Sequence, residues 1–477
     1  MLLVFVHGWS VRRTDTYGGL PEALQQRAAN HGLELEVAHV FLGRYISFHD
    51  EVTLDDISRG FEQALRDQLP DNADGRKPFS CITHSTGGPV VRNWVEIFYG
   101  ADGLDRLPLK HLIMLAPANH GSALAQLGRG RLSRIRSFFR GVEPGQGVLD
   151  WLELGSEPQC ELNLRWLEYR SPENGFFPFV LTGQQHDPSL YDHLNAYTGE
   201  RGSDGVVRVC AANMNYRYVH LRQTTEIVRA RRSGRHPRAT AMEVVTDSVR
   251  RSPPVPLGVL PETSHSGDDM GIMRSVTPEN ADGKLVVREI LRCLQVADAA
   301  GFRRREEELR LLTRQTQEED YALRNVDPYM MVVFRLFDDY DNAVNDYDLL
   351  LLAGSNYDED DLPRGFFVDR QRNQRSPNTL TYYLNAHRMR DVEKPRIGFR
   401  VIGRPTEGFA SYTAAEFRAE PEMFDHLVVP NETILVDLEL HRQVDRNIFR
   451  LDDLRQERHS FKGESPNAGD LDPGLVD

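Results

Sequence analysis

The stretch Phe79-Ser-Cys-Ile-Thr-His-Ser-Thr-Gly-Gly-Pro-Val-Val-Arg92 decides the fold. It starts as a short apolar run, which predicts a buried strand, and continues past Ser85 into a segment with helical spacing. A serine on a tight turn between a strand and a helix has a strained backbone that lifts its hydroxyl clear of the sheet. Small residues are needed two positions to either side, and Gly87 and the compact Thr83 meet this need. We therefore predict that Ser85 is a nucleophile.

Strand-like and helix-like segments alternate around this stretch through the first 300 residues. The strand-like segments are apolar throughout, as expected where helices cover both faces of a parallel sheet. The predicted strands are 2–6, 33–41, 79–83, 109–116, 177–182 and 206–211, and the predicted helices are 21–30, 53–68, 90–99 and 284–315. This order predicts an α/β fold with a mostly parallel sheet.

Three loops make these residues resemble the lipase-like branch of the α/β-hydrolase superfamily, which includes bacterial lipases, inositol-deacylase-like proteins and phospholipase effectors. Leu115-Ala-Pro-Ala-Asn-His-Gly-Ser122 is similar to the P-x-x-G-S loop that follows a sheet strand in these lipases. Gly202-Ser-Asp-Gly-Val-Val207 resembles the loop with the aspartate of the catalytic triad, and Ser264-His-Ser-Gly267 resembles the loop with its histidine. The resemblance implies an α/β-hydrolase fold and a catalytic triad in the chain order of this superfamily. The implied triad is Ser85, Asp204 and His265.

The acid of this triad has two competitors. Asp187 and Asp192 lie just after a predicted strand, which places them near the same edge of the sheet. Asp204 is favoured because the Gly-Val-Val that follows it matches the family pattern.

The base has competitors as well. His220 lies in an alternating, strand-like run, which favours a structural role, and His236 lies in the basic segment 229–238, which is typical of an exposed loop. His84 is expected to pack beside the turn, because the residue before the serine rarely acts as its base. His265 therefore remains the predicted base.

The N-terminal strand ends in His7-Gly8-Trp9-Ser10, which resembles the first oxyanion loop of the superfamily. Acyl transfer passes through a tetrahedral intermediate whose negative oxygen is stabilised by fixed backbone N–H groups. We expect the two donors to be the amides of Thr86 and Trp9, with Ser10 as the alternative to Trp9. Such a mechanism requires no metal and no organic cofactor.

Composition excludes several classes of protein. The chain has 477 residues and a net charge of −14, which argues against a general affinity for nucleic acid. The sequence contains no run of about 18 apolar residues, so no transmembrane helix is predicted. The apolar N-terminus lacks a basic leader, so we expect synthesis in the cytoplasm without a classical signal peptide. The four scattered cysteines are expected to be reduced and buried.

The charge and the residue pattern of the sequence change after residue 300. Residues 301–477 hold 24 Lys and Arg against 35 Asp and Glu, a net charge of −11, whereas the first 300 residues carry only −3. We predict a catalytic domain over 1–300, a helical linker over 301–325, a mostly-β, sandwich-like domain over 326–455 and a disordered tail over 456–477. The predicted strands of the second domain are 330–336, 347–353, 365–368, 379–385, 396–402 and 433–440. This domain is interpreted as a membrane-docking or partner-recognition module, and its acidic loops 338–341 and 358–361 raise calcium binding as a further hypothesis.

A lid-like insertion is predicted at about 122–175. Its first part combines apolar residues at helical spacing with interleaved arginines, which suits a helix that meets an anionic lipid surface. A core-facing amphipathic helix with a basic outer face explains the pattern equally well. The predicted substrate-contacting residues are Leu127, Leu132, Ile135, Phe138 and Phe139.

These observations predict a serine esterase that acts on lipid acyl esters, with phospholipase A-type activity favoured. The lipase-like core, the missing signal peptide and the unexplained β-rich domain resemble type VI secretion lipase effectors of bacteria. This resemblance implies a secretion-system component and an immunity protein as partners. A soluble carboxylesterase, a thioesterase or an acyltransferase is the alternative on the same triad, and an inactive hydrolase-fold scaffold is the alternative of another class.

Overall fold

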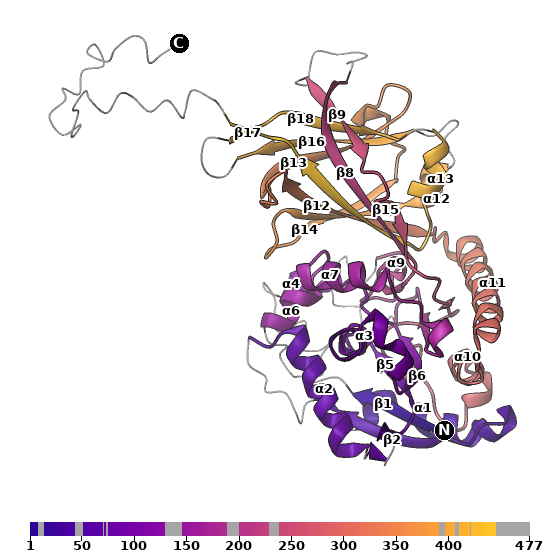
Figure 1. Ribbon diagram of the computed structural model, residues 1–477. Coiled ribbons are helices and arrows are strands. Elements are labelled where there is room, and N and C mark those ends of the chain that lie inside the picture. The colour runs from indigo at the N-terminus through magenta and orange to yellow at the C-terminus, as the bar shows by residue number, and fades with distance from the viewer. Residues whose placement is uncertain are drawn as a thin grey trace, which may run out of the picture.

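The computed structural model contains two β-sheets, one below the other in Figure 1, with helices around the lower one. It describes residues 1–7, 14–42, 51–69, 71–72, 75–128, 146–187, 200–228, 238–390, 396–405, 410–419 and 421–444. The predicted tail over 456–477 lies outside these residues.

The lower sheet has six strands, and every pair of neighbours is parallel. Its order is β11-β7-β6-β5-β1-β2. The strands are β1 (Leu2–His7), β2 (Glu36–Phe41), β5 (Phe79–His84), β6 (Leu109–Leu115), β7 (Phe177–Thr182) and β11 (Leu257–Val259). The predicted mostly parallel sheet is confirmed, whereas the predicted strand 206–211 is wrong, because Val209–Ala212 forms the short helix α9.

Helices cover both faces of this sheet, which is why its strands are apolar at every position. Alternate residues of β1 enter different cores: Val4 packs with Ile57 and Val90 on one face, and Phe5 packs with Leu24 and Ile290 on the other. The covering helices are α1 (Leu20–Ala28), α2 (Leu54–Gln68), α3 (Gly87–Phe98) and α10 (Leu285–Leu294). The predicted helix 284–315 is in fact two helices, α10 and α11 (Ala299–Arg324).

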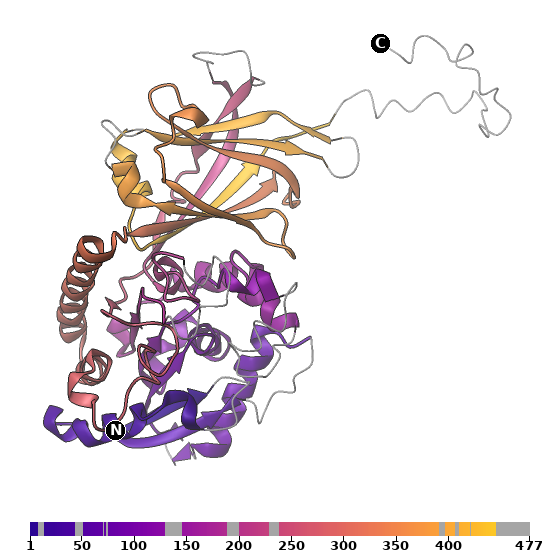
Figure 2. The ribbon, with the colours of Figure 1, turned by 180° about the vertical axis from the view of Figure 1, so that it is seen from behind.

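The long helix α11 lies along the edge of the lower sheet, as Figures 1 and 2 both show. The hydroxyl of Thr313 accepts a 2.9 Å hydrogen bond from the amide of Val259 and donates one of 2.9 Å to the carbonyl of Leu257. These bonds satisfy main-chain groups of the edge strand β11 that have no neighbouring strand on that side. The predicted linker helix therefore packs against the lower sheet.

The upper sheet is a single mixed sheet that curls on itself (Figure 2). Its order is β13-β16-β18-β9-β8-β19-β12-β15-β14, with β10 paired to β8. The strands are β8 (Tyr216–Ile227), β9 (Ala239–Val244), β10 (Arg250–Arg251), β12 (Tyr329–Asp338), β13 (Asp346–Ala353), β14 (Phe367–Arg372), β15 (Thr379–Asn385), β16 (Ile397–Arg404), β18 (Ala414–Arg418) and β19 (Thr433–Leu440). Its two ends approach one another, since the hydroxyl of Tyr382 donates a 2.6 Å hydrogen bond to the carbonyl of Leu349.

The strands of the two sheets are not separated at the predicted domain boundary near residue 300. β8, β9 and β10 come from residues 216–251, yet they belong to the upper sheet, where β8 pairs with β19 in parallel. The chain therefore leaves the lower part after α9, contributes three strands to the upper sheet, and returns to form β11.

The two sheets share a core. On β12, Met331 and Val333 pack with residues of the lower part, whereas Met330, Val332 and Phe334 pack within the upper part. Because both faces of this strand are covered, the run Tyr329–Phe334 is apolar without alternation. The second sheet is thus fixed against the first by a continuous apolar interface.

Smaller elements complete the described chain. Three helices lie between β6 and β7, in the region predicted as a lid: α4 (Leu124–Gly128), α6 (Gln146–Leu152) and α7 (Glu157–Trp166). The others are α12 (Ala386–Arg390), α13 (Phe424–Leu427) and the strand pairs β3 (Asp71–Asn72) with β4 (Gly75–Arg76) and β17 (Ala410–Tyr412) with β20 (Arg442–Val444). Among the described helices, none has the length and apolar character needed to cross a membrane. All four cysteines are buried free thiols.

Candidate active site

Ser85 lies at the turn between β5 and α3 and has a left-handed backbone, with φ = 54°. Few residues other than glycine adopt this region, so the turn stores strain. Hydrogen bonds hold it: the Ser85 amide donates to the carbonyl of Leu115 at 3.0 Å, and the Ser85 carbonyl accepts from the amide of Ala118 at 3.2 Å. The strand, turn and helix predicted around Ser85 are all present.

The glycines after Ser85 are required by close packing. A Cβ atom on Gly88 would lie 2.7 Å from Cβ of Pro117, closer than side chains approach one another. A Cβ atom on Gly87 would lie 3.1 Å from Cβ of Thr83. Thr83 is therefore accommodated two residues before Ser85 because Gly87, which faces it, has no side chain.

Asp204 and His265 are brought together from loops 61 residues apart in the chain. Nδ1 of His265 donates a 2.9 Å hydrogen bond to Oδ2 of Asp204, and both side chains are fully buried. The other carboxylate oxygen, Oδ1, accepts from the amides of Val206 at 3.0 Å and Val207 at 2.8 Å. The carboxylate is thus fixed on both sides and aligns the imidazole from behind.

The main chain adds a further link between these loops, because the His265 amide donates a 2.9 Å hydrogen bond to the carbonyl of Asp204. His84, the neighbour of Ser85, reaches the same place: its Nε2 lies 3.1 Å from the carbonyl oxygen of His265, and the two rings are 4.5 Å apart. The Ser85 turn and the Asp204–His265 pair therefore meet at one end of the lower sheet.

The competing residues are placed differently. Asp187 is buried beside Gly267, so it borders the His265 loop, but the carboxylate that receives the Nδ1 bond belongs to Asp204. His220 lies on β8 in the upper sheet, with Nε2 3.2 Å from Glu439. Asp192 and His236 lie outside the described residues.

The predicted oxyanion donors are only partly within the described chain. Thr86 follows Ser85 and precedes the first turn of α3, whereas Trp9 and Ser10 lie outside the described residues. Just before that loop, Nε2 of His7 is 2.9 Å from Nδ1 of His39. Burial, together with His39, lowers the pKa of His7 to about 3, so this ring is neutral near pH 7.

The predicted substrate residues Leu132, Ile135, Phe138 and Phe139 lie outside the described residues. Leu127 is in the short helix α4, and its side chain is also outside the description. Among the residues that the structure describes, no cluster of three or more His, Cys, Asp or Glu side chains suits a metal ion.

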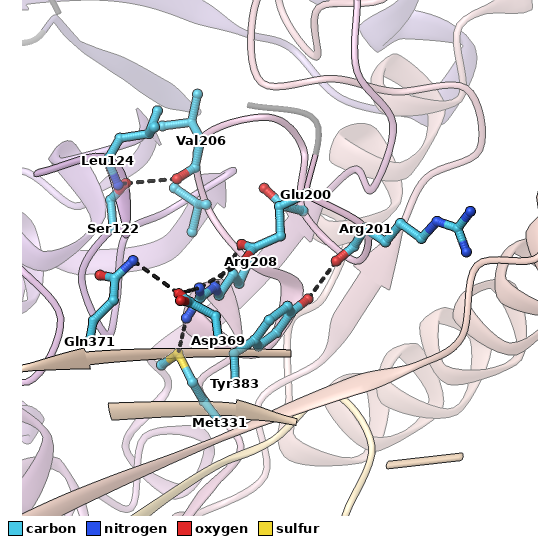
Figure 3. A network of polar contacts seen from close by, with 12 residues as sticks. Ser122, Leu124, Glu200, Arg201, Val206, Arg208, Met331, Asp369, Gln371 and Tyr383 are labelled. Carbon is cyan, nitrogen blue, oxygen red and sulfur yellow. Dashed lines mark hydrogen bonds and ion pairs between the residues drawn. The ribbon is translucent and has the colours of Figure 1, made fainter. Parts of the chain in front are cut away.

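The loop that carries Asp204 is bound to the upper sheet, a contact that was not predicted from the sequence. Arg208 is buried and makes a two-pronged ion pair with Glu200, with both N···O distances 2.8 Å (Figure 3). Its Nη2 also donates a 2.6 Å hydrogen bond to Asp369 on β14. Burial acts to lower the pKa of Arg208, but Glu200, Tyr383 and Asp369 together outweigh it and raise the pKa.

Tyr383 on β15 completes this contact. Its ring lies 4.1 Å from the guanidinium carbon of Arg208, and its hydroxyl donates a 2.7 Å hydrogen bond to the carbonyl of Arg201 (Figure 3). Gly202, with φ = 75°, allows the loop to come this close, since a Cβ there would lie 2.4 Å from the ring of Tyr329. Arg208 lies within the apolar run 206–211, and an arginine in such a position is the signal from which a buried partner could have been inferred.

A second buried arginine supports α3, the helix that follows Ser85. Arg92 of α3 donates to Oδ1 of Asn119 at 3.2 Å and to Oδ1 of Asn163 at 2.8 Å. Burial lowers its pKa to about 10. Asn163 in turn donates to Nδ1 of His120 at 3.1 Å. This network connects α3 to the loop 115–122 and to α7, and it fixes the position of α3.

Comparison with solved structures extends along nearly the whole chain. Two structures of phospholipase PlaB from Legionella pneumophila are similar to it, one at 44% identity with a TM-score of 0.84, covering 96% of both chains. The other, in complex with thio-NAD, is 43% identical, with a TM-score of 0.82, and covers 95% of this chain and 96% of that one. The chain belongs to the lipase-like branch of the α/β-hydrolases. The predicted family, fold and enzyme class, an ester hydrolase of lipase type, are confirmed.

The likeness to PlaB includes the upper sheet, whereas the resemblance visible in the sequence ended near residue 300. A further match, lipase BlEst2 from Bacillus licheniformis, is 17% identical over 44% of this chain with a TM-score of 0.32. No family model and no curated protein sequence matches the chain.

Proposed function

We propose that this protein hydrolyses acyl ester bonds of phospholipids, with Ser85 as nucleophile, His265 as general base and Asp204 as the acid that orients it. The observation that carries the proposal is the 2.9 Å hydrogen bond between Asp204 and His265, beside a serine with a left-handed backbone. The similarity to a phospholipase over 95% of the chain supports the choice of substrate.

The mechanism follows from these roles. His265 takes the proton of the Ser85 hydroxyl as its oxygen attacks the ester carbonyl, and Asp204 stabilises the resulting imidazolium. The amides of Thr86 and Trp9 stabilise the oxyanion of the tetrahedral intermediate, each contributing about 3–4 kcal/mol. His265 then protonates the leaving alcohol, and water releases the fatty acid from the acyl-enzyme by the same steps.

The basic segment between Ser122 and Gly141 favours phospholipids over neutral fats. It carries five arginines among leucine, isoleucine and phenylalanine residues, in a chain whose net charge is −14. Cationic side chains beside apolar ones attract the protein to an anionic lipid surface. In this proposal Leu127, Leu132, Ile135, Phe138 and Phe139 contact the acyl chains.

The proposal extends to a biological role. A secretion machine delivers the protein to a neighbouring cell, and an immunity protein protects the cell that produces it. This role rests on the combination of a lipase-type core with a second, β-rich sheet. Expression in the periplasm of a test bacterium is expected to stop growth, while the Ser85→Ala variant is harmless. Equal growth with both would contradict this role and leave the hydrolase activity untouched.

Mass spectrometry of lipid products tests the function directly. Purified protein is incubated with vesicles of phosphatidylglycerol or phosphatidylcholine, with triglyceride and with short p-nitrophenyl esters. We expect fatty acid and lysophospholipid from the vesicles, no products with Ser85→Ala, and normal turnover with Ser411→Ala, an exposed serine on β17. Activity restricted to the short esters would instead favour a soluble carboxylesterase.

The same assay is run with and without a nicotinamide dinucleotide, because one PlaB structure contains thio-NAD. A dinucleotide-dependent change in rate would extend that likeness to this chain. Absence of turnover on every ester would favour the inactive scaffold.

A further inference from the structure

The curled upper sheet encloses a cavity of about 440 Å³ that is partly open to solvent. Most of its lining is apolar and comes from strands on opposite sides of the curl, including Val332 on β12, Leu351 on β13, Phe399 on β16 and Val436 on β19. Small-molecule sites in proteins typically have volumes of about 300–1,000 Å³, so this cavity is large enough for a ligand.

The cavity is lined by apolar residues because both faces of the upper sheet are apolar, and only one of them packs against the lower part. On β12 the residues between the lining positions, Met331 and Val333, are committed to the interface with the lower part. The opposite face of the same strand, with Val332 and Phe334, is free to surround the cavity. An unfilled apolar space of this size forfeits contacts that a closely packed core would make.

The mouth of the cavity has a different chemistry from its interior. Arg217, Arg250 and Arg251 lie there, and Val249, which is 61% exposed, marks an apolar edge open to solvent. Arg217 and Arg251 share one carboxylate, that of Glu432, at 2.9 Å and 3.1 Å.

The third arginine, Arg250, pairs with Glu168 at 2.9 Å, a carboxylate that is 64% exposed. Arg250 also lies over the ring of Tyr218, which packs against the core of the lower part, so its guanidinium is turned toward that part. The guanidinium groups of Arg217 and Arg251 share a single carboxylate, which leaves an excess of positive charge beside an apolar cavity. Guanidinium groups bind carboxylate and phosphate groups with two parallel hydrogen bonds.

We propose that this cavity binds a free long-chain fatty acid, with the acyl chain inside and the carboxylate at the arginines. An apolar cavity of about 150 Å³ holds one six-carbon benzene ring, so about 440 Å³ corresponds to a single chain of roughly 18 carbons. The ligand is the acyl product of the proposed hydrolysis, and in this respect the inference rests on the proposed function. The site itself belongs to the upper sheet and uses none of the catalytic residues.

Binding is measured with the full-length Ser85→Ala variant, so that lipid turnover does not interfere. A fluorescent fatty-acid probe is bound and then displaced by palmitate. Leu351→Trp, which fills the cavity, is expected to weaken palmitate binding about tenfold or more. Leu350→Trp is the matched control, because Leu350 is the neighbouring residue on β13, is partly exposed and is absent from the lining. Equal affinity in these two variants would overturn the site.

A second variant tests the head group without altering the core. Arg251 is 63% exposed, so Arg251→Gln is expected to fold normally and to weaken palmitate about threefold while binding of hexadecanol stays unchanged. Arg404→Gln, at an exposed ion pair on β16, is the control. Equal losses for acid and alcohol would overturn the carboxylate contact, and tighter binding of lysophosphatidylcholine than of palmitate would overturn the choice of fatty acid.

The two proposals fail separately. Persistent lipid hydrolysis by Ser85→Ala would contradict the proposed nucleophile and leave the binding result standing. Normal hydrolysis by the wild-type protein, with palmitate affinity indifferent to both Leu351→Trp and Arg251→Gln, would contradict only the fatty-acid site.

Discussion

Arg208, four residues after Asp204, donates a 2.6 Å hydrogen bond to Asp369 on the upper sheet. The loop that holds the proposed catalytic acid is therefore anchored to a strand more than 160 residues away in the chain. Tyr383 packs on the same guanidinium and binds the carbonyl of Arg201. The upper sheet thus takes part in positioning the candidate site.

Loosening this contact should slow catalysis without unfolding the protein. Asp369→Asn keeps an oxygen acceptor but removes the charge, so Arg208 remains paired with Glu200 while its tie to β14 weakens. We expect kcat on phospholipid vesicles to fall about tenfold or more with little change in KM, because small displacements near the reacting groups are costly. Asp348→Asn, at an exposed ion pair on β13, serves as control. Equal kcat in both variants would show that the anchor is only structural.

Asp204→Asn should leave the fold intact and reduce kcat by about 10⁴-fold, because an amide holds the imidazole in the wrong tautomer. The measurement is steady-state hydrolysis, with circular dichroism to verify folding. Asp187→Asn tests the neighbouring carboxylate and is expected to cost far less. A larger loss with Asp187→Asn than with Asp204→Asn would exchange the roles of the two acids.

Gly88→Ala should destabilise the protein by about 1–3 kcal/mol, the usual cost of overpacking. The new Cβ would lie 2.7 Å from Cβ of Pro117, so α3 must shift away from the loop 115–122. Activity is expected to decrease as well, since Ser85 begins the same turn. Urea denaturation measures the change, with Gly283→Ala as control because its Cβ would meet no atom within 4 Å. Similar stabilities for the two variants would refute the packing argument.

Acid should destabilise the fold through buried neutral histidines. Burial and the nearby Arg92 lower the pKa of His120 to about 3, and His7 behaves alike. The unfolded chain takes up protons near the ordinary histidine value whereas the folded protein does not. The free energy of unfolding therefore falls as the pH drops from about 6.5 toward 3, by at most about 1.4 kcal/mol per pH unit for each ring.

Urea denaturation at several pH values checks this, with His120→Gln as the variant. It removes one of the rings, so its free energy of unfolding is expected to depend less steeply on pH than that of the wild-type protein. The comparison uses slopes, because the substitution also alters the hydrogen bond from Asn163. Parallel slopes would contradict a neutral, buried His120.

Much of the lower sheet could be predicted because its information is local. Strands such as Phe79–His84 and Leu109–Leu115 are short apolar runs, and the serine turn is specified by Ser85 and the glycines directly after it. The predicted strand 206–211 is wrong for a physical reason. A buried helix of four residues is as apolar as a buried strand, and it is too short to show the helical period in its sequence.

The upper sheet was predicted strand by strand but not as a whole. Thr379–Asn385 and Thr433–Leu440 were expected as strands. Their sequence pattern did not indicate that Tyr216–Ile227 pairs with Thr433–Leu440. Pairing between strands about 200 residues apart depends on complementary faces, which only the folded chain brings together.

The sequence alone determined the family, the serine turn and the identity of the aspartate and histidine loops, because each is carried by a few consecutive residues whose backbone geometry restricts the amino acids allowed. The tertiary structure decided how those loops are held. The contact of Arg208 with Asp369, the return of β8 to β10 into the second sheet and the cavity with arginines at its mouth all join residues distant in the chain. Such contacts depend on packing in three dimensions, and no short stretch of sequence encodes them.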